Sequence, residues 1–237
     1  MRSIAISNLK GGVGKTVTTI SLAHILAAEY GKRVLMVDCD GQCNLTRFFC
    51  PDLPEDALTV AEVLEGTGEV HWSDNVTEAG PGLLLLPASS GLYRLDIAAI
   101  TRGGASLGGL RQFVEAAAED EGAEVGVDVV LFDCPPGFTA ASSAALLAAE
   151  EVILPVLADG FSLEGMVDMA RQIQSLRQVN PRLRVTGVLL NQWRRCPVVE
   201  QGEALLRRMG LPVFETVIRR SEKVPESTID KTALPSY

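Results

Sequence analysis

Residues 10–16 read Lys-Gly-Gly-Val-Gly-Lys-Thr, and this stretch decides the fold. It follows an apolar run at 4–6 that is typical of a short buried strand, and it precedes a helical pattern over 17–28. A strand, a glycine-rich turn and a helix N-terminus form a phosphate cradle, because the backbone N–H groups of the turn can point at an anion. The lysine of such a loop reaches the β- and γ-phosphates, and the following hydroxyl can bind Mg²⁺. We therefore predict that Lys15 contacts phosphate and that Thr16 is a magnesium ligand.

Apolar runs and helical patterns alternate along the rest of the chain. Near-continuous apolar strands separated by helices indicate a parallel sheet that is covered on both faces. We therefore predict an α/β fold of the P-loop NTPase type, in which a mostly parallel twisted sheet carries helices on both faces, as a single domain over residues 1–237. Further strands are expected at 33–38, 83–87, 127–133, 152–156 and 185–191, and helices at 60–64, 107–121, 140–149, 163–179 and 200–209, with 50–82 as the least regular stretch.

Two acidic motifs follow predicted strands. Residues 38–44 read Asp-Cys-Asp-Gly-Gln-Cys-Asn, and residues 129–137 read Val-Val-Leu-Phe-Asp-Cys-Pro-Pro-Gly. Ligands of parallel sheets bind at the carboxyl ends of the strands, so both motifs are expected to lie beside the glycine-rich loop. An acid that ends a buried strand is the Walker B arrangement, which holds Mg²⁺ through water. We assign Asp38 and Asp133 to the metal; the alternative for Asp133 is that it only caps the next turn.

The glycine-rich loop departs from the strict pattern G-x-x-x-x-G-K-[ST], because Leu9 stands at the first glycine position. It matches instead the deviant Walker A form with a second lysine, here Lys10, near the start of the loop. In this it resembles the ParA/MinD family of dimeric ATPases. The resemblance implies that ATP and Mg²⁺ are the cofactors and that Lys10 reaches across the dimer to the partner's nucleotide. Val17 departs from the family, which usually carries Thr or Ser there.

Residues 38–44 are similar to the family segment Asp-x-Asp-Pro-Gln-Gly-Asn. The resemblance implies that Asp40 positions or activates the hydrolytic water. Gly41 and Cys43 stand where the family has proline and glycine. Glycine makes the loop more flexible, and a cysteine adopts a positive φ only at a cost. The switching behaviour of this loop is therefore left open.

The resemblance also assigns the nucleotide base. Asn191 ends a predicted strand and matches the base-contacting asparagine of the family, although an Asn there often only forms a turn. The segment 212–214 resembles the other base-flanking segment. The predicted catalytic residues are Lys10, Lys15 and Asp40, and the predicted nucleotide-binding residues are Gly11, Gly12, Val13, Gly14, Lys15, Thr16, Val17, Asn191, Pro212 and Phe214.

Charge is distributed unevenly along the chain. The net charge of −9 alone argues against nucleic acid, but residues 1–159 carry 9 basic and 22 acidic residues whereas residues 160–237 carry 12 and 8. Such asymmetry between halves is a sign of a binding surface, and the alternative is a solvated face. We place DNA phosphate contacts in the basic segment, at Arg194, Arg195, Arg219, Arg220 and Lys223.

The motif order is closest to the short ParA/Soj type. By the resemblance, ATP closes two subunits into a sandwich dimer that binds DNA without sequence preference, and a ParB-like adaptor stimulates hydrolysis, so that a DNA or protein cargo is segregated or positioned. No apolar run approaches the roughly 20 residues that span a bilayer, and no signal peptide precedes the loop. We expect a cytoplasmic, nucleoid-associated protein without membrane binding.

Two alternatives stay open. One is a MinD-like spatial regulator that acts through a membrane or a polar protein, although residues 228–237 are too short and too weakly amphipathic for a membrane helix. The other is a metabolic or metal-handling ATPase of the same fold. The five cysteines form no C-x-x-C pair and are expected to be free thiols.

Overall fold

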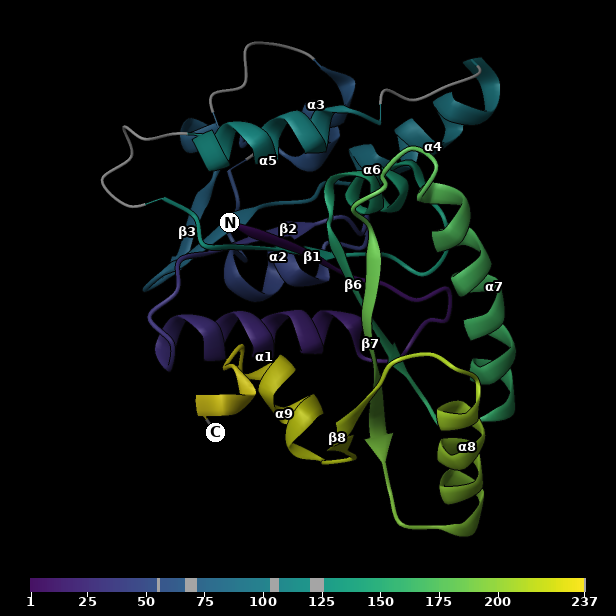
Figure 1. Ribbon diagram of the computed structural model, residues 1–237. Helices are drawn as coiled ribbons and strands as arrows, with labels where there is room; N and C mark the ends of the chain where they lie inside the picture. Colours follow the sequence, from purple (N-terminus) through teal and green to yellow (C-terminus); the bar gives the residue numbers. More distant parts are fainter. Residues whose placement is uncertain (55, 67–71, 103–106, 120–125, 237) are drawn as a thin grey trace.

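The computed structural model describes residues 1–54, 56–66, 72–102, 107–119 and 126–236 (Figure 1). Within these residues, eight strands form one sheet in the order β3-β4-β2-β5-β1-β6-β7-β8, and only the β3–β4 pair is antiparallel. The predicted α/β class with a mostly parallel sheet is therefore confirmed. The strands are β1 (Arg2–Ile6), β2 (Val34–Asp38), β3 (Thr77–Gly80), β4 (Leu83–Leu86), β5 (Val129–Asp133), β6 (Glu151–Val156), β7 (Arg184–Trp193) and β8 (Val213–Arg219).

Helices cover both faces of the sheet, as predicted (Figure 1). One apolar cluster joins one face of the strands to α3–α8, and a second joins the other face to α1 and α2. The helices are α1 (Lys15–Ala28), α2 (Asn44–Phe49), α3 (Val60–Glu65), α4 (Gly91–Arg102), α5 (Gly109–Glu119), α6 (Ala140–Ala148), α7 (Gly160–Leu176), α8 (Pro197–Arg208) and α9 (Lys223–Ile229), with 3₁₀ turns η1 (Trp72–Asn75) and η2 (Leu234–Ser236).

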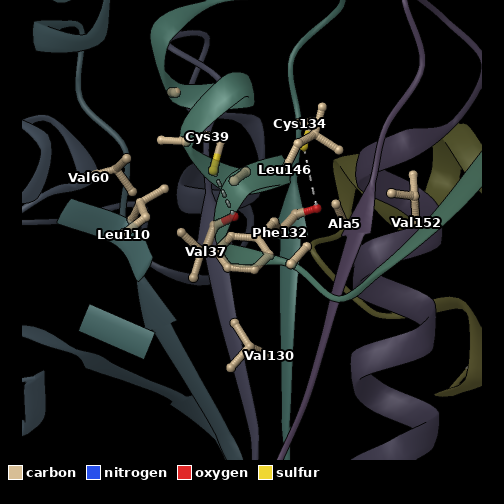
Figure 2. Packing of buried hydrophobic residues seen from close by; sticks show 14 of the residues in the cluster. Ala5, Val37, Cys39, Val60, Leu110, Val130, Phe132, Cys134, Leu146 and Val152 are labelled. Atoms are coloured by element: carbon tan, nitrogen blue, oxygen red, sulfur yellow. Dashed lines mark hydrogen bonds between the residues drawn. The ribbon is translucent and has the colours of Figure 1, made fainter. Parts of the chain in front are cut away.

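The central strands explain why the sequence shows continuous apolar runs. Every residue of β2 and β5 is buried, because alternate side chains enter the two clusters. Val37 and Phe132 point into the cluster beneath α3–α8, where Figure 2 shows them side by side with Val130. This packing fixes the backbone up to the last residue of each strand, where the acidic motifs begin.

The structure also differs from the predicted boundaries. Within 50–82, the helix predicted at 60–64 is present as α3, whose buried apolar side chains contribute to the core, whereas the edge strand β3 was not predicted. The helix predicted at 200–209 already begins at Pro197, because proline is favoured in the first turn of a helix. Residues 120 and 121, at the end of the helix predicted over 107–121, lie outside the described residues. No helix within the described part of the chain is long and apolar enough to cross a bilayer.

Candidate functional site

The glycine-rich loop connects β1 to α1 and is built on left-handed backbone. Gly12 and Gly14 have φ of +73° and +87°, a region that glycine enters without strain. Gly14 is also required by space, since an added Cβ would lie 2.3 Å from Asn191 Nδ2. Asn191, in β7, donates from Nδ2 to the Val13 carbonyl at 2.9 Å, and Gln192 Nε2 donates to the Gly12 carbonyl at 2.9 Å. The end of β7 therefore holds the loop in place.

Lys15 folds back over this loop. Its side chain is 7% exposed, and Nζ donates to the carbonyl oxygens of Lys10 at 2.9 Å and Asn8 at 3.2 Å. Burial lowers the pKa of Lys15, while the charge of Asp133 opposes that shift. The ammonium borders a cavity of about 540 Å³, which is lined by Gly11, Gly12, Gly14, Lys15, Thr16, Val17, Asp40, Gln42, Asn44, Tyr93, Pro135, Pro136 and Thr139.

Asp38 and Asp133 are register partners at the carboxyl ends of β2 and β5. Both are buried, and their interactions differ. Asp38 Oδ2 accepts hydrogen bonds from the Thr46 N–H at 2.8 Å and hydroxyl at 2.7 Å, and Asp38 Oδ1 accepts from the Asp40 N–H at 3.1 Å. Asp133 Oδ1 accepts a long bond from Thr19 Oγ1 at 3.3 Å, and the Asp133 side chain also interacts with Thr16. Among the residues that the structure describes, Asp133 Oδ2 has no hydrogen-bond partner. Asp38 thus anchors α2, whereas Asp133 keeps an oxygen available.

The electrostatics of this pair fit a divalent cation. Burial raises the pKa of Asp133 to about 8, and the neighbouring charge of Asp38 adds to the shift. Burial likewise raises the pKa of Asp38 to about 6, against the hydrogen bonds from Thr46. A buried carboxylate oxygen without a partner is costly unless a cation approaches it. Mg²⁺ is usually held by one or two carboxylates together with phosphate oxygens and water. Thr16 and Asp133, whose side chains are hydrogen-bonded, are the residues that could hold it.

The loop after Asp38 carries Asp40 to the edge of the same cavity. Asp40 Oδ1 accepts from the Gln42 N–H at 2.9 Å, and the Asp40 carbonyl accepts from the Cys43 N–H at 2.8 Å. Cys43 has a φ of +55° and precedes α2. It therefore adopts the left-handed conformation in spite of its side chain, at the position where the resembled segment carries glycine.

Lys10 lies beside the start of α7. Its Nζ is 2.8 Å from Asp159 Oδ2 and 3.3 Å from the Ser162 hydroxyl. Asp159 caps α7 by accepting from the Ser162 N–H at 2.8 Å. The hydrogen bond and the charge of Lys10 help to lower the pKa of Asp159, against the effect of burial. Lys10 is thus paired with Asp159, and neither residue lines the cavity beside Lys15, which is called the phosphate cavity below.

A second cavity, of about 580 Å³, lies on the other side of the loop. Asn191 and Phe214, which the resemblance assigns to the base, line it together with Gly14 and Val17 of the glycine-rich loop, whereas Pro212 is not among its lining residues. The Phe214 ring lies against Gly187, where an added Cβ would be 2.3 Å from Phe214 Cζ. Apolar walls next to an amide are suited to an aromatic base.

Sequence comparisons assign this site to a family. Residues 1–185 match the AAA_31 family, described as an AAA domain. The chain is 38% identical over 232 residues to the chromosome-partitioning ATPase Soj of Thermus thermophilus, covering 96% of this chain and 84% of that protein. The chain belongs to the ParA/MinD-type ATPases.

Solved structures agree with this membership. A cobyrinic acid a,c-diamide synthase from Mycobacterium smegmatis, with bound ATP analog and magnesium, is 31% identical with a TM-score of 0.81, covering 93% of this chain and 85% of that one. Apo McdA of Cyanothece has a TM-score of 0.85 at 23% identity, covering 100% of this chain and 92% of that one, and shows the shared fold. The chain therefore shares the fold of these structures.

The basic residues that were predicted to contact DNA lie near the ends of β7 and β8. Arg194 and Arg195 follow β7, and the Arg220 N–H donates to the Trp193 carbonyl at 3.0 Å, so the ends of β7 and β8 lie together. Arg195 lies 4.0 Å from Glu200, Arg220 lies 3.8 Å from Glu222, and Lys223 lies 2.6 Å from Glu226. Arg219 and Arg220 also line the second cavity, which sequence reasoning did not anticipate.

Three residues near the nucleotide loop were missed by sequence reasoning. Gln192 holds the loop, Asp159 holds Lys10, and Tyr93 lines the phosphate cavity. Gln192 directly follows the predicted Asn191, which was a usable signal. Asp159 and Tyr93 are distant in sequence from the motifs they contact, so no local pattern indicated them.

Proposed function

We propose that this protein is a ParA/Soj-type ATPase that forms a sandwich dimer with ATP, binds DNA without sequence preference and segregates or positions a DNA or protein cargo. The observation that carries the proposal is the partnerless Asp133 oxygen, buried next to Thr16 and close to Lys15 at the glycine-rich loop. A Mg²⁺–nucleotide complex would bring a cation to this oxygen and phosphates to Lys15.

The residues of the cavity divide the chemistry among them. Lys15 binds the β- and γ-phosphates, and Thr16 and Asp133 hold the metal. Mg²⁺, when bound, neutralises charge on the phosphates. Asp40 lines the cavity, where its carboxylate can orient a water for attack. Asp38 supports this arrangement by tying the loop of Asp40 to α2 through Thr46.

The position of Lys10 supports the proposed dimerisation. In one protomer its ammonium is held by Asp159, and both side chains are partly exposed, at 34% and 39%. Exposed ion pairs of this kind contribute little, about 0–1 kcal/mol. A partner's nucleotide can therefore attract Lys10 away from Asp159 at small cost, which makes the pair compatible with a cross-subunit contact.

DNA binding is proposed for the basic end of β7 and β8. Each phosphate contact releases counterions, so nonspecific affinity grows with the number of contacts and falls steeply with salt. A dimer doubles the contacts that one protomer offers. The partners are thus a second copy, DNA and a ParB-like adaptor that stimulates hydrolysis, in the cytoplasm on the nucleoid.

A metabolic function is the second candidate. It is favoured by the 31% identity to the structure named as a cobyrinic acid a,c-diamide synthase. An enzyme that activates a carboxylate would form ADP only when its acceptor substrates are present, whereas the proposed ATPase responds to DNA and an adaptor protein.

The proposal is tested by the oligomeric state with ATP and Mg²⁺. Asp40→Ala should bind ATP and be trapped as a dimer in size-exclusion chromatography with light scattering, because hydrolysis no longer reopens it. Asp40→Ala combined with Lys10→Ala should bind ATP as a monomer. A stable ATP dimer in the Lys10→Ala background would contradict the cross-subunit role, and monomers under all conditions would contradict the proposed function.

A further inference from the structure

Tyr93, near the start of α4, lies against the loop that carries Asp40. An ideal Cβ added to Gly41 would lie 2.9 Å from Tyr93 Cζ and 3.1 Å from both Cε atoms, so the aromatic ring covers the glycine. The Tyr93 hydroxyl accepts a hydrogen bond from Gln42 Nε2. The same tyrosine lines the phosphate cavity together with Asp40 and Gln42.

Space, rather than backbone conformation, explains the glycine at position 41. The positive-φ residues of this loop do not include Gly41, whereas Cys43 is among them. A side chain at position 41 would displace the ring of Tyr93, which is 43% exposed, from its place over the loop. The family segment that this loop resembles has a proline at the position of Gly41, and that proline would stiffen the backbone. In this chain the ring of Tyr93, from α4, packs on the loop at that position instead.

The helix that carries Tyr93 is itself firmly placed. Leu92 and Leu95 are 4% and 8% exposed and belong to the apolar cluster beneath α3–α8. Asp96 accepts from the N–H of Ala140, the first residue of α6, at 2.8 Å. Ala140 lies three residues after the Pro-Pro-Gly turn that follows Asp133. One helix thus contacts the loop of Asp40 through Tyr93 and, through Asp96, the start of the helix that follows the loop of Asp133.

We propose that Tyr93 is a positioning residue for Asp40. Its ring and hydroxyl restrict residues 40–43, and this restriction keeps the Asp40 carboxylate at the edge of the phosphate cavity. The inference rests on the proposed function for the role of Asp40, but the restraint on the loop is a property of the nucleotide-free chain. Tyr93 acts through the loop and is assigned no contact with the reacting atoms.

The restraint is tested first by hydrogen exchange on the nucleotide-free protein. Tyr93→Ala should speed exchange of the Gln42 and Cys43 amides about tenfold, because those N–H groups are held by Asp40 within the loop. Tyr93→Phe, which keeps the ring and removes the hydroxyl, should lie between Tyr93→Ala and the unmodified chain. Tyr30→Ala, at an exposed tyrosine beyond α1, is the matched control and should change nothing in this loop. Unchanged exchange in Tyr93→Ala would overturn the inference.

A double-variant cycle then separates positioning from general destabilisation. Gly41→Ala should lower the melting temperature when Tyr93 is present and have little effect in the Tyr93→Ala background, since the colliding ring is gone. Tyr93→Ala should lower kcat about tenfold with KM for ATP unchanged, because a small misplacement of a reacting group is costly in rate. Adding Gly41→Pro to Tyr93→Ala should restore kcat to within about threefold of the unmodified chain, by supplying stiffness from within the loop.

The outcomes distinguish this inference from the proposed function. Additive effects in the cycle, with normal ATP hydrolysis by the unmodified chain, would overturn the role of Tyr93 alone. A chain that hydrolyses no ATP but shows the exchange and melting effects would retain Tyr93 as the loop restraint and contradict the proposed function.

Discussion

The centre of the sheet and its C-terminal edge are built in opposite ways. All residues of β2 and β5 are buried, and each strand ends in a buried carboxylate. β8 at the edge is half-buried or exposed throughout and is followed by Arg220. In the proposed function, the chemistry that depends on fixed geometry lies where packing on two faces fixes the backbone, and the contacts that depend mainly on charge lie where side chains are exposed to solvent. The acidic segment, residues 1–159, contains the central strands β2 and β5, and the basic segment, residues 160–237, contains β7 and β8 at the edge.

The largest effect is expected from a substitution at the centre of the sheet. Lys15→Ala should weaken ATP binding by at least about 100-fold, because a buried ammonium beside the phosphates is lost in a site of low dielectric. The measurement is calorimetric titration with ATP and Mg²⁺. Lys32→Ala is the matched control, since Lys32 precedes β2 at its other end and pairs with Asp128 at 3.8 Å. A loss below threefold in Lys15→Ala would refute the assigned cradle.

Asp133→Asn separates stability from activity at the centre. The nucleotide-free variant should be at least as stable as the unmodified chain, by up to about 1 kcal/mol, because a buried partnerless carboxylate is replaced by a neutral amide. Its Mg²⁺-dependent hydrolysis should fall about 100-fold. Denaturant unfolding and phosphate release measure the two quantities. Strong destabilisation without loss of hydrolysis would show that Asp133 is structural and only caps the turn that follows it.

At the edge, replacing Arg219, Arg220 and Lys223 together with alanine should weaken ATP-dependent DNA binding about 10- to 100-fold and reduce the salt slope by roughly 2–3. ATP binding by this variant must be measured in parallel, because Arg219 and Arg220 also line the second cavity. The control replaces Arg171, Arg177 and Arg182, which removes the same charge in and after α7. Equal losses in both variants would mean that net charge, not this edge, determines binding.

The smallest effect is expected at Glu151, at the end of the sheet where the parallel strands begin. Glu151 begins β6, is 3% exposed, and is contacted by Arg2 at 2.8 Å and Arg184 at 3.2 Å. Burial raises its pKa, but hydrogen bonds from Thr186 and Arg2 and the two arginine charges outweigh burial, so the pKa is lowered. Its stabilisation is therefore present above the pKa of the unfolded chain and is lost as the pH falls through the folded-state pKa.

Glu151→Gln should consequently cost about 1–2 kcal/mol of unfolding free energy at neutral pH and progressively less in acid, with hydrolysis and DNA binding unchanged. Unfolding titrations at several pH values measure this. Glu150→Gln is the neighbouring control, because Glu150 is 39% exposed and its pair with Arg182 lies at the surface. An equal effect in both variants would contradict the contribution of the buried pair.

The same contrast explains what the sequence could predict. The apolar runs of β2 and β5 and the glycines before α1 impose their structure locally, so the strands, the loop and the three motifs were predictable. The contacts of Lys10 with Asp159 and of Gly41 with Tyr93 depend on the folded sheet, and no local pattern connects those positions. α4 was missed for a local reason, since it begins directly after Ser-Ser and its first residue is glycine, a composition typical of turns.

DNA binding by the purified chain, measured with ATP, with ADP and without nucleotide across a salt series, tests the central claim most directly. The account predicts binding with ATP only, weakening with a log–log salt slope of about −0.9 per phosphate contact. Equal binding in all three states, or none in any state despite ATP-induced dimers, would contradict it and leave the basic edge to a protein or membrane partner.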